Sequence, residues 1–131
     1  MSDAPEDLVE AATAVRENAI ATFSGFKVGS ALRTDSGTVY AGCNVENATL
    51  GLTVCAERVA LWKALSEGER TFTEIAVVTA AERPTPTCGA CRQLLWEFCG
   101  DIPVYMVSTL GKKATLLLSE LVPYPFDKRD L

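Results

Sequence analysis

The fold is decided by a short apolar stretch, EIAVVT at residues 74–79. Its central residues are apolar without interruption, a pattern typical of a strand that is buried on both faces. A helical pattern precedes this stretch at residues 52–64, and another follows it at residues 89–98. Because helices alternate with a buried strand, we expect an α/β fold, in the form of a three-layer α/β/α sandwich around a mixed sheet.

The rest of the chain supplies the other elements of this sandwich. Apolar residues recur at helical spacing over residues 8–20, after a start signal that consists of Asp3, Pro5 and Glu6. A last short helix is expected at residues 118–122. Four further strands, which make the sheet five-stranded, are expected at residues 27–34, 38–44, 103–108 and 113–117. No repeat or long linker divides the chain, so we expect a single domain over residues 1–131.

Composition and charge limit the classes of function. The 131 residues are 48% apolar, but no apolar run approaches the ~20 residues that cross a bilayer, so no membrane partner is expected. The net charge of −5 would repel a polyphosphate backbone, which argues against a nucleic-acid partner. The acidic N-terminus has no signal-peptide pattern and the cysteine count of five is odd, so we expect reduced thiols in the cytoplasm.

Three cysteines form the strongest chemical pattern in a chain that has no histidine. Cys55 opens the motif Cys-Ala-Glu, and Cys88 and Cys91 form a Cys-x-x-Cys motif. Three thiolates and one open position describe a zinc ion that activates water, because structural zinc sites normally have four protein ligands. Glu57 would stand beside the metal without ligating it, where a proton shuttle is needed.

Other interpretations of the cysteines are simpler. A Cys-x-x-Cys motif can be a redox pair, a structural zinc clip or two core residues. A redox pair does not account for the Cys-Ala-Glu motif, and a closed zinc site would need Cys43 or Cys99 as its fourth ligand. We interpret both of these as small buried hydrophobic residues, Cys43 at a strand end and Cys99 at a helix end.

The predicted helices give the ligand positions a physical reason. Cys55 would begin one helix, and Cys88 and Cys91 another, so two helix N-termini would favour the thiolate forms at the metal. Three thiolates overcompensate a divalent cation, and nearby positive charge is therefore needed. We expect Arg58 to donate hydrogen bonds to the ligating sulfurs, although an exposed ion pair is the simpler interpretation. The role of Arg92 stays open between such a donor and a surface or subunit-interface residue.

Three motifs, in this order and spacing, resemble the small homotetrameric cytidine deaminases: NVEN at residues 44–47, CAER at residues 55–58 and CGACRQ at residues 88–93. The likeness covers nearly the whole chain, and the motifs are specific in combination.

The resemblance implies a cofactor, an assembly and roles for residues. Zn²⁺ would be held by Cys55, Cys88 and Cys91, with Glu57 as the general acid and base. The family is homotetrameric, so the chain would have copies of itself as partners. The same three-layer fold is implied.

A second group of residues would bind the substrate, a pyrimidine nucleoside. Asn44 and Glu46 can hydrogen-bond ribose hydroxyls, and the carboxylate would disfavour a phosphate, although the pattern alone is equally typical of a polar loop. The family likeness favours ribose contacts. Phe26 resembles the base-packing phenylalanine of the family, and Phe126 a residue that reaches a neighbouring subunit's pocket. Backbone groups near Ala56 would contact the edge of the pyrimidine ring.

The chain departs from the family pattern at the rim of the expected pocket. Thr22 and Phe23 replace a proline and a tyrosine, Leu50 replaces a tyrosine, and Thr87 replaces a proline. We expect none of these residues to contact a metal ligand or Glu57. Phe23 and Leu50 could reshape the rim, so we predict that bulkier or modified cytidines, including N4-modified ones, are admitted.

The sequence thus predicts zinc-dependent hydrolysis of cytidine and 2'-deoxycytidine to uridine and 2'-deoxyuridine, with release of ammonia, in pyrimidine salvage. One alternative is a deaminase for a nucleoside antibiotic of the blasticidin type. A second alternative is a non-catalytic, zinc-stabilised oligomeric binding module, against which the presence of Glu57 argues.

Overall fold

A computed structural model describes residues 3–131, and a mixed five-stranded sheet forms its centre. The strand order is β2-β1-β3-β4-β5, in which β3 and β4 are parallel and the other neighbours antiparallel. The prediction of a mixed five-stranded sheet is confirmed. The strands are β1 (Val28–Thr34), β2 (Val39–Cys43), β3 (Phe72–Thr79), β4 (Pro103–Ser108) and β5 (Lys113–Leu117).

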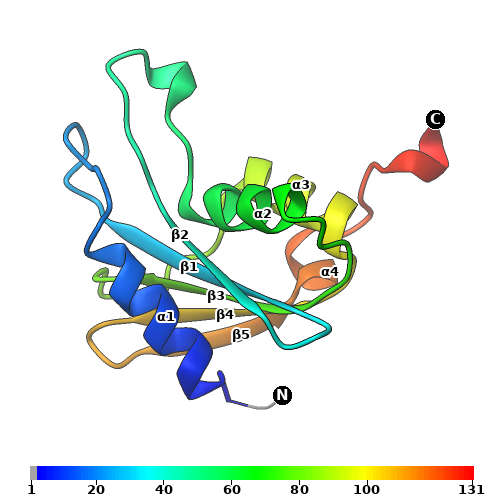
Figure 1. Ribbon diagram of the computed structural model, residues 1–131, viewed down its shortest axis with the longest axis horizontal. Coiled ribbons are helices and arrows are strands. Elements are labelled where there is room, and N and C mark those ends of the chain that lie inside the picture. The colour runs from blue at the N-terminus through cyan, green and yellow to red at the C-terminus, as the bar shows by residue number, and fades with distance from the viewer. Residues whose placement is uncertain (1–2) are drawn as a thin grey trace.

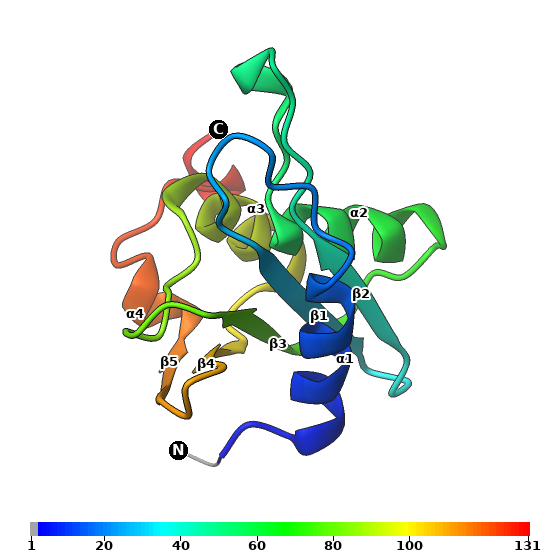
Figure 2. The ribbon, with the colours of Figure 1, turned by 90° about the vertical axis from the view of Figure 1, so that its left-hand side faces the viewer.

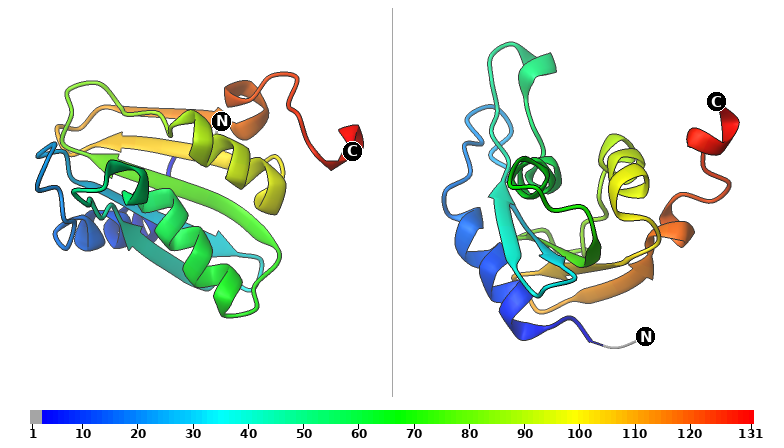
Figure 3. Two further views of the ribbon diagram at one scale, coloured as in Figure 1. Left: turned by 90° about the horizontal axis from the view of Figure 1, so that it is seen from above. Right: turned by 45° about the vertical axis from the view of Figure 1, so that its right-hand side comes forward.

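Helices cover both faces of this sheet and make the three predicted layers. Helix α1 (Glu6–Arg16) lies on one face, and α2 (Ala56–Ser66) and α3 (Gly89–Cys99) lie side by side on the other (Figures 1 and 3). The short helix α4 (Leu118–Leu121) follows β5 directly, and the two 3₁₀ helices are η1 (Leu50–Leu52) and η2 (Lys128–Asp130).

The position of strand β3 in the fold explains why residues 75–78 are apolar without interruption. Ala76 and Val78 belong to the core beneath α1, whereas Ile75 belongs to the core beneath α2 and α3. Both faces of the strand are therefore buried from Ile75 onward, whereas the polar residues Thr73 and Glu74 occupy its more exposed start.

Two glycines allow the helices to approach the sheet closely. A Cβ atom at Gly29 would lie 1.9 Å from the carbonyl oxygen of Ala12 in α1. A Cβ atom at Gly42 would lie 2.5 Å from the amide nitrogen of Ala60 in α2. Any larger residue would thus push a helix away from its strand.

Two helix boundaries differ by four residues from the sequence prediction. Helix α1 ends at Arg16 because Ile20 forms a bridge to Val45. Helix α2 begins at Ala56 instead of residue 52, because Val54 exchanges two backbone hydrogen bonds of 3.0 Å with Val45. The segment between Val45 and Val54 carries η1 and projects beyond the helices (Figure 2). The N-cap of α1 is Pro5, so the predicted start signal at Asp3 was placed too early.

Within residues 3–131, no helix combines the length and the apolar character that crossing a membrane requires.

Candidate active site

Three thiols meet where two helices begin. Cys55 is the N-cap residue of α2, Cys88 is the N-cap residue of α3, and Cys91 lies in the first turn of α3. The three Sγ atoms lie within 4.8 Å of one another, and the Sγ atoms of Cys55 and Cys88 are 3.8 Å apart. The structure thus brings together sulfurs that are 33 residues apart in sequence, and it directs two helix N-termini at them.

This donor set fits a zinc ion. Tetrahedral zinc with sulfur bonds of about 2.3 Å requires sulfurs about 3.8 Å apart, which is the separation of Cys55 and Cys88. Hydrogen bonding to Cys91 and Cys88 and the charge of Arg58 lower the pKa of the Cys55 thiol to about 5. The pKa of Cys91 is raised by its hydrogen bond to Cys55 and by burial. Binding of a divalent cation would displace the protons that remain on these thiols.

The number of thiols leaves one coordination position open. Among residues 3–131, the cluster of potential metal ligands consists of these three cysteines only. Cys99 packs against the core beneath α3, and burial raises the pKa of its thiol to about 12, so it stays protonated. Three protein ligands and an open position are typical of catalytic zinc sites.

Arg58 lies beside the thiols, as the sequence analysis expected. Its Nη2 atom donates to the Sγ atom of Cys55 at 3.7 Å, and hydrogen bonding to Cys91 raises the pKa of the guanidinium group. The Nε atom of Arg58 is buried without a hydrogen-bond partner in the structure. A permanent positive charge therefore offsets part of the negative charge that three thiolates would bring.

Glu57 is buried next to this cluster, with 5% of its surface exposed. Burial raises the pKa of its carboxyl group, so the group retains a proton to higher pH than a solvated glutamate. The hydroxyl of Thr87 donates to Oε2 of Glu57 at 2.5 Å, and Thr87 is itself 1% exposed. The expectation that Thr87 would not contact Glu57 was wrong, because the loop before α3 folds back onto the first turn of α2.

A pocket of about 280 Å³ opens above the thiols and Glu57. Its walls include every residue that the sequence analysis assigned to the substrate except Phe126. Most of its lining area is carbon, and Phe26, Val28, Val54 and Pro86 contribute to it. A small, largely apolar pocket with a few polar groups at each end suits a small heterocyclic ligand.

Asn44 holds the pocket wall that contains Phe26. Its Nδ2 atom donates to the carbonyl oxygen of Phe26, and its Oδ1 atom accepts from the amide of Val28, both at 2.8 Å. A primary amide has two donor hydrogens and two acceptor lone pairs, so one of each is still available to a ligand.

Glu46 is held in a similar way at the same end of the pocket. Its Oε1 atom accepts from the amides of Phe23 at 2.8 Å and Ser24 at 3.0 Å, and its Oε2 atom accepts from the Ser24 hydroxyl. The Ser24 hydroxyl and amide lower the pKa of the Glu46 carboxyl, which keeps the group ionised. This end of the pocket therefore carries a negative charge.

Comparison with known proteins agrees with the geometry. Residues 2–107 match the family model described as the cytidine and deoxycytidylate deaminase zinc-binding region. The chain belongs to this family. A cytidine deaminase from Sporosarcina psychrophila is 44% identical over 127 residues, which cover 96% of this chain and 93% of the relative. A cytidine deaminase from Halalkalibacterium halodurans is 46% identical and covers 95% of each chain.

Solved structures show the same family and fold. A 1.6 Å crystal structure of a cytidine deaminase from Burkholderia pseudomallei superimposes with a TM-score of 0.90 at 45% identity, and it covers 94% of this chain and 99% of that one. More distantly, a blasticidin-S deaminase from Bacillus cereus is 30% identical over 109 residues, 77% of each chain. The deaminase family and its fold are thus established for this chain.

Phe126 lies apart from the pocket of its own chain. The C-terminal tail is fastened to α3, because Gln93 donates to the carbonyl of Phe126 at 2.8 Å and Trp96 donates to Asp127 at 2.9 Å. The Phe126 side chain is 61% exposed. Arg92, whose role was left open, donates to the backbone carbonyls of Thr87 at 2.7 Å and Leu121 at 2.9 Å, and so ties the loop before α3 to α4.

Several residues in or next to the pocket were given no role from the sequence. Ser24 holds Glu46, and Thr87 holds Glu57. Thr87 could have been singled out as the neighbour of a metal ligand, but its partner is 30 residues away in sequence. The other unassigned lining residues are Val28, Thr53, Val54, Val77, Thr85 and Pro86.

Proposed function

We propose that the protein catalyses the hydrolytic deamination of cytidine and 2'-deoxycytidine to uridine and 2'-deoxyuridine, with release of ammonia. The observation that carries the proposal is the buried carboxyl group of Glu57 beside three clustered thiols at one end of a small pocket. A structural zinc site needs neither an open coordination position nor a buried acid beside it.

The pocket residues would orient the nucleoside before reaction. Glu46 and Asn44 would hydrogen-bond the sugar hydroxyls through their remaining acceptor and donor positions. Phe26 would pack against the base, and backbone groups near Ala56 would contact the ring edge. These contacts would hold C4 of the base near the thiols, since Cys55 and Cys88 line the same pocket as Glu46.

Glu57 would carry the protons of the reaction. Zn²⁺ held by Cys55, Cys88 and Cys91 would supply the Lewis acidity that makes water a nucleophile toward C4 at neutral pH. A buried carboxyl group with a raised pKa can deliver a proton to N3 of the ring and then a second one to the departing amino group. Water provides both the oxygen added to C4 and the protons that Glu57 passes on.

Charge supports a nucleoside over larger or more anionic substrates. The ionised Glu46 would repel a phosphate on the sugar, and the net charge of −5 would disfavour nucleic acid. We therefore expect free nucleosides as substrates, and a role in pyrimidine salvage.

Exposed apolar side chains support a homo-oligomer, which we propose to be a tetramer. Trp62, Leu110 and Phe126 are 49%, 65% and 61% exposed. Phe126 would then complete the pocket of a neighbouring subunit. All five cysteines are free, which supports a reducing compartment such as the cytoplasm.

The ultraviolet absorbance of cytidine tests the proposal. We expect zinc-loaded wild-type protein to convert cytidine, and Glu57→Gln to lose about 10³-fold or more in kcat/KM while it retains zinc. Glu74→Gln is the matched control, because Glu74 is a partly buried carboxylate on the opposite face of the sheet. Full activity of Glu57→Gln would refute the assigned mechanism. No turnover of either nucleoside by the zinc-loaded wild type would refute the function.

Modified substrates test the departures from the family pattern. Phe23 and Leu50 line a second hollow together with Ser24, Glu46 and Thr53, at the Glu46 end of the pocket. This position supports tolerance of bulk near the sugar, and it provides no additional room near N4. Turnover of an N4-substituted cytidine, compared with that of cytidine, tests the N4 part of the prediction, and absence of turnover would remove it.

A further inference from the structure

Thr87, the residue before Cys88, contacts Glu57, the acid proposed to transfer the protons. Thr87 Oγ1 and Glu57 Oε2 are 2.5 Å apart, in a contact that is buried on both sides. Solvent therefore does not compete for the hydroxyl hydrogen. A glutamate carboxyl group rotates easily about its last side-chain bond, because this bond has no sharp staggered minima. The buried hydrogen bond supplies the constraint that the side chain itself lacks.

Thr87 is itself held in place. Arg92 in α3 donates from Nε to the Thr87 carbonyl oxygen at 2.7 Å, and the next residue, Cys88, is the N-cap of α3. Arg92 also bonds the carbonyl of Leu121 at 2.9 Å. The backbone that carries the hydroxyl is thus fixed on the side of α3, whereas Glu57 belongs to α2.

We propose that Thr87 is a positioning residue that sets the plane of the Glu57 carboxyl group and assigns its two oxygens. Because the hydroxyl donates to Oε2, this oxygen is engaged in the buried contact and Oε1 is not. Oε1 is thus the oxygen that transfers protons to the substrate, and Oε2 is the anchor. This inference rests on the proposed deamination, since it concerns the orientation of the group that performs the proton transfer.

A pair of substitutions separates the hydroxyl from the shape of the side chain. Thr87→Val keeps the branched shape and removes the hydrogen bond, whereas Thr87→Ser keeps the hydroxyl and removes the methyl group. Single-turnover rates with enzyme in excess report the chemical step without product release. We expect Thr87→Val to lose roughly 10-fold to 100-fold in this rate with KM nearly unchanged, and Thr87→Ser to stay within about 3-fold of wild type.

A binding measurement gives a readout apart from turnover. Tetrahydrouridine has a tetrahedral C4 with a hydroxyl group, like the transition state, whereas uridine has a planar C4. We expect Thr87→Val to weaken tetrahydrouridine binding by about the same factor as the rate, and to leave uridine binding nearly unchanged. Equal weakening of both ligands would show a general loss of pocket shape and would overturn the inference.

Thr34→Val is the matched control. Thr34 is also 1% exposed, and its hydroxyl is hydrogen-bonded to Ser36 and to the amide of Thr38, in the turn between β1 and β2. We expect this variant to keep the wild-type rate, and all variants to keep zinc by elemental analysis. A Thr87→Val rate within 2-fold of wild type, or a loss that Thr87→Ser shares, would overturn the inference. Neither result would affect the proposed function, which fails only if wild type does not deaminate the nucleosides.

Discussion

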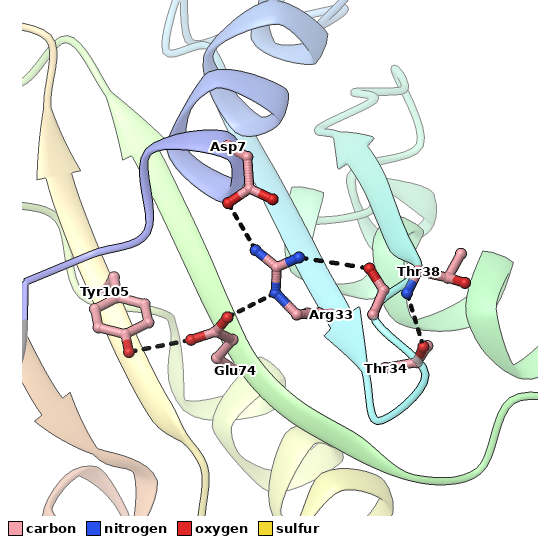
Figure 4. A network of polar contacts seen from close by, with 7 residues as sticks. Asp7, Arg33, Thr34, Thr38, Glu74 and Tyr105 are labelled. Atoms are coloured by element: carbon pink, nitrogen blue, oxygen red, sulfur yellow. Dashed lines mark hydrogen bonds and ion pairs between the residues drawn. The ribbon is translucent and has the colours of Figure 1, made fainter.

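Two arginines on opposite faces of the sheet are used in different ways. Arg33, on the α1 face, pairs with Glu74 at 2.7 Å and with Asp7 at 2.8 Å, and Glu74 also accepts from the hydroxyl of Tyr105 at 3.2 Å (Figure 4). A third contact of Arg33 reaches the carbonyl of Gly37 at 3.4 Å. This network joins α1 to β1, β3 and β4. All three nitrogens of the Arg33 guanidinium group donate hydrogen bonds, two of them to carboxylates and one to a carbonyl oxygen.

Arg58, on the α2 and α3 face, has softer partners. Its guanidinium group donates to sulfurs, among them those of Cys55 and Cys91, and its buried Nε has no hydrogen-bond partner. Buried polar atoms are usually satisfied, so an exception in a folded protein needs an explanation. Here the guanidinium group interacts with three thiols and with a buried carboxyl group.

The comparison distinguishes a cluster that stabilises the fold from one that is arranged for a ligand. The Arg33 network pairs its guanidinium group with carboxylates of the fold itself, and its substitution should therefore change stability. The Arg58 cluster has thiols that gain their full negative charge only with a cation, and its substitution should therefore change metal binding and activity. Both clusters contain an arginine and a buried or partly buried glutamate, so residue type alone does not separate them.

The largest effect is expected when a thiol is removed from the Arg58 cluster. We expect Cys91→Ser to lose most of its zinc and about 10³-fold or more of its activity, because serine is a much poorer zinc ligand. Cys99→Ser is the control, since the Cys99 thiol belongs to the same helix but lies outside the cluster. Elemental analysis and cytidine turnover measure both effects. A Cys91→Ser protein with full zinc content would contradict the assignment of the metal site.

Alanine substitutions at Gly29 and Gly42 test what the close packing of α1 and of α2 against the sheet contributes to stability and to the site. We expect Gly29→Ala to destabilise the fold by at least about 3 kcal/mol, because its Cβ would overlap the Ala12 carbonyl oxygen of α1. Gly42→Ala would cost about 1–3 kcal/mol and would also displace the α2 turn that carries Cys55 and Glu57. Urea unfolding and turnover of the folded fraction measure the two effects. Equal specific activities for the two variants would argue against a link between Gly42 and the site.

Replacing each arginine with methionine compares the roles of the two clusters directly. We expect Arg58→Met to lower kcat/KM by roughly 10-fold to 100-fold with little change in melting temperature. We expect Arg33→Met to lower the free energy of unfolding by about 1–3 kcal/mol without changing kcat/KM. The same pattern of effects in both variants would remove the distinction between the two clusters.

The smallest effect concerns the pH dependence of the Arg33 network. The hydrogen bond from Arg33 lowers the pKa of Asp7 from its ordinary value of 3.8. A lowered pKa means that the stabilisation is complete above the ordinary pKa and is lost as the pH falls through the lowered one. We expect Asp7→Asn to be slightly less stable than wild type at pH 7, with a difference that shrinks below pH 3.8. A difference that stays constant over this range would show that Asp7 acts without its charge.

The pattern of the sequence predicted the layers well because each face of the sheet leaves a local signature. The apolar run of β3 indicates burial on both faces, and Cys55 and Cys88 each stand immediately before a helix, at the N-cap position. The two helix boundaries with the largest errors, the end of α1 and the start of α2, have a common cause. Val45 pairs with Val54 and forms a bridge to Ile20, and such pairings join segments that are distant in sequence.

Sequence alone determined the chemical kind of site: three sulfurs at helix starts with an acid two residues after the first of them, because these residues and spacings are local properties of the chain. The tertiary structure decided how that acid is held and what its neighbours do. Thr87 reaches Glu57, Asn44 and Glu46 hold the backbone of the pocket wall, and Phe126 lies outside its own pocket. Each of these contacts joins residues 16 or more positions apart, so folding had to bring them together before their chemistry could be recognised.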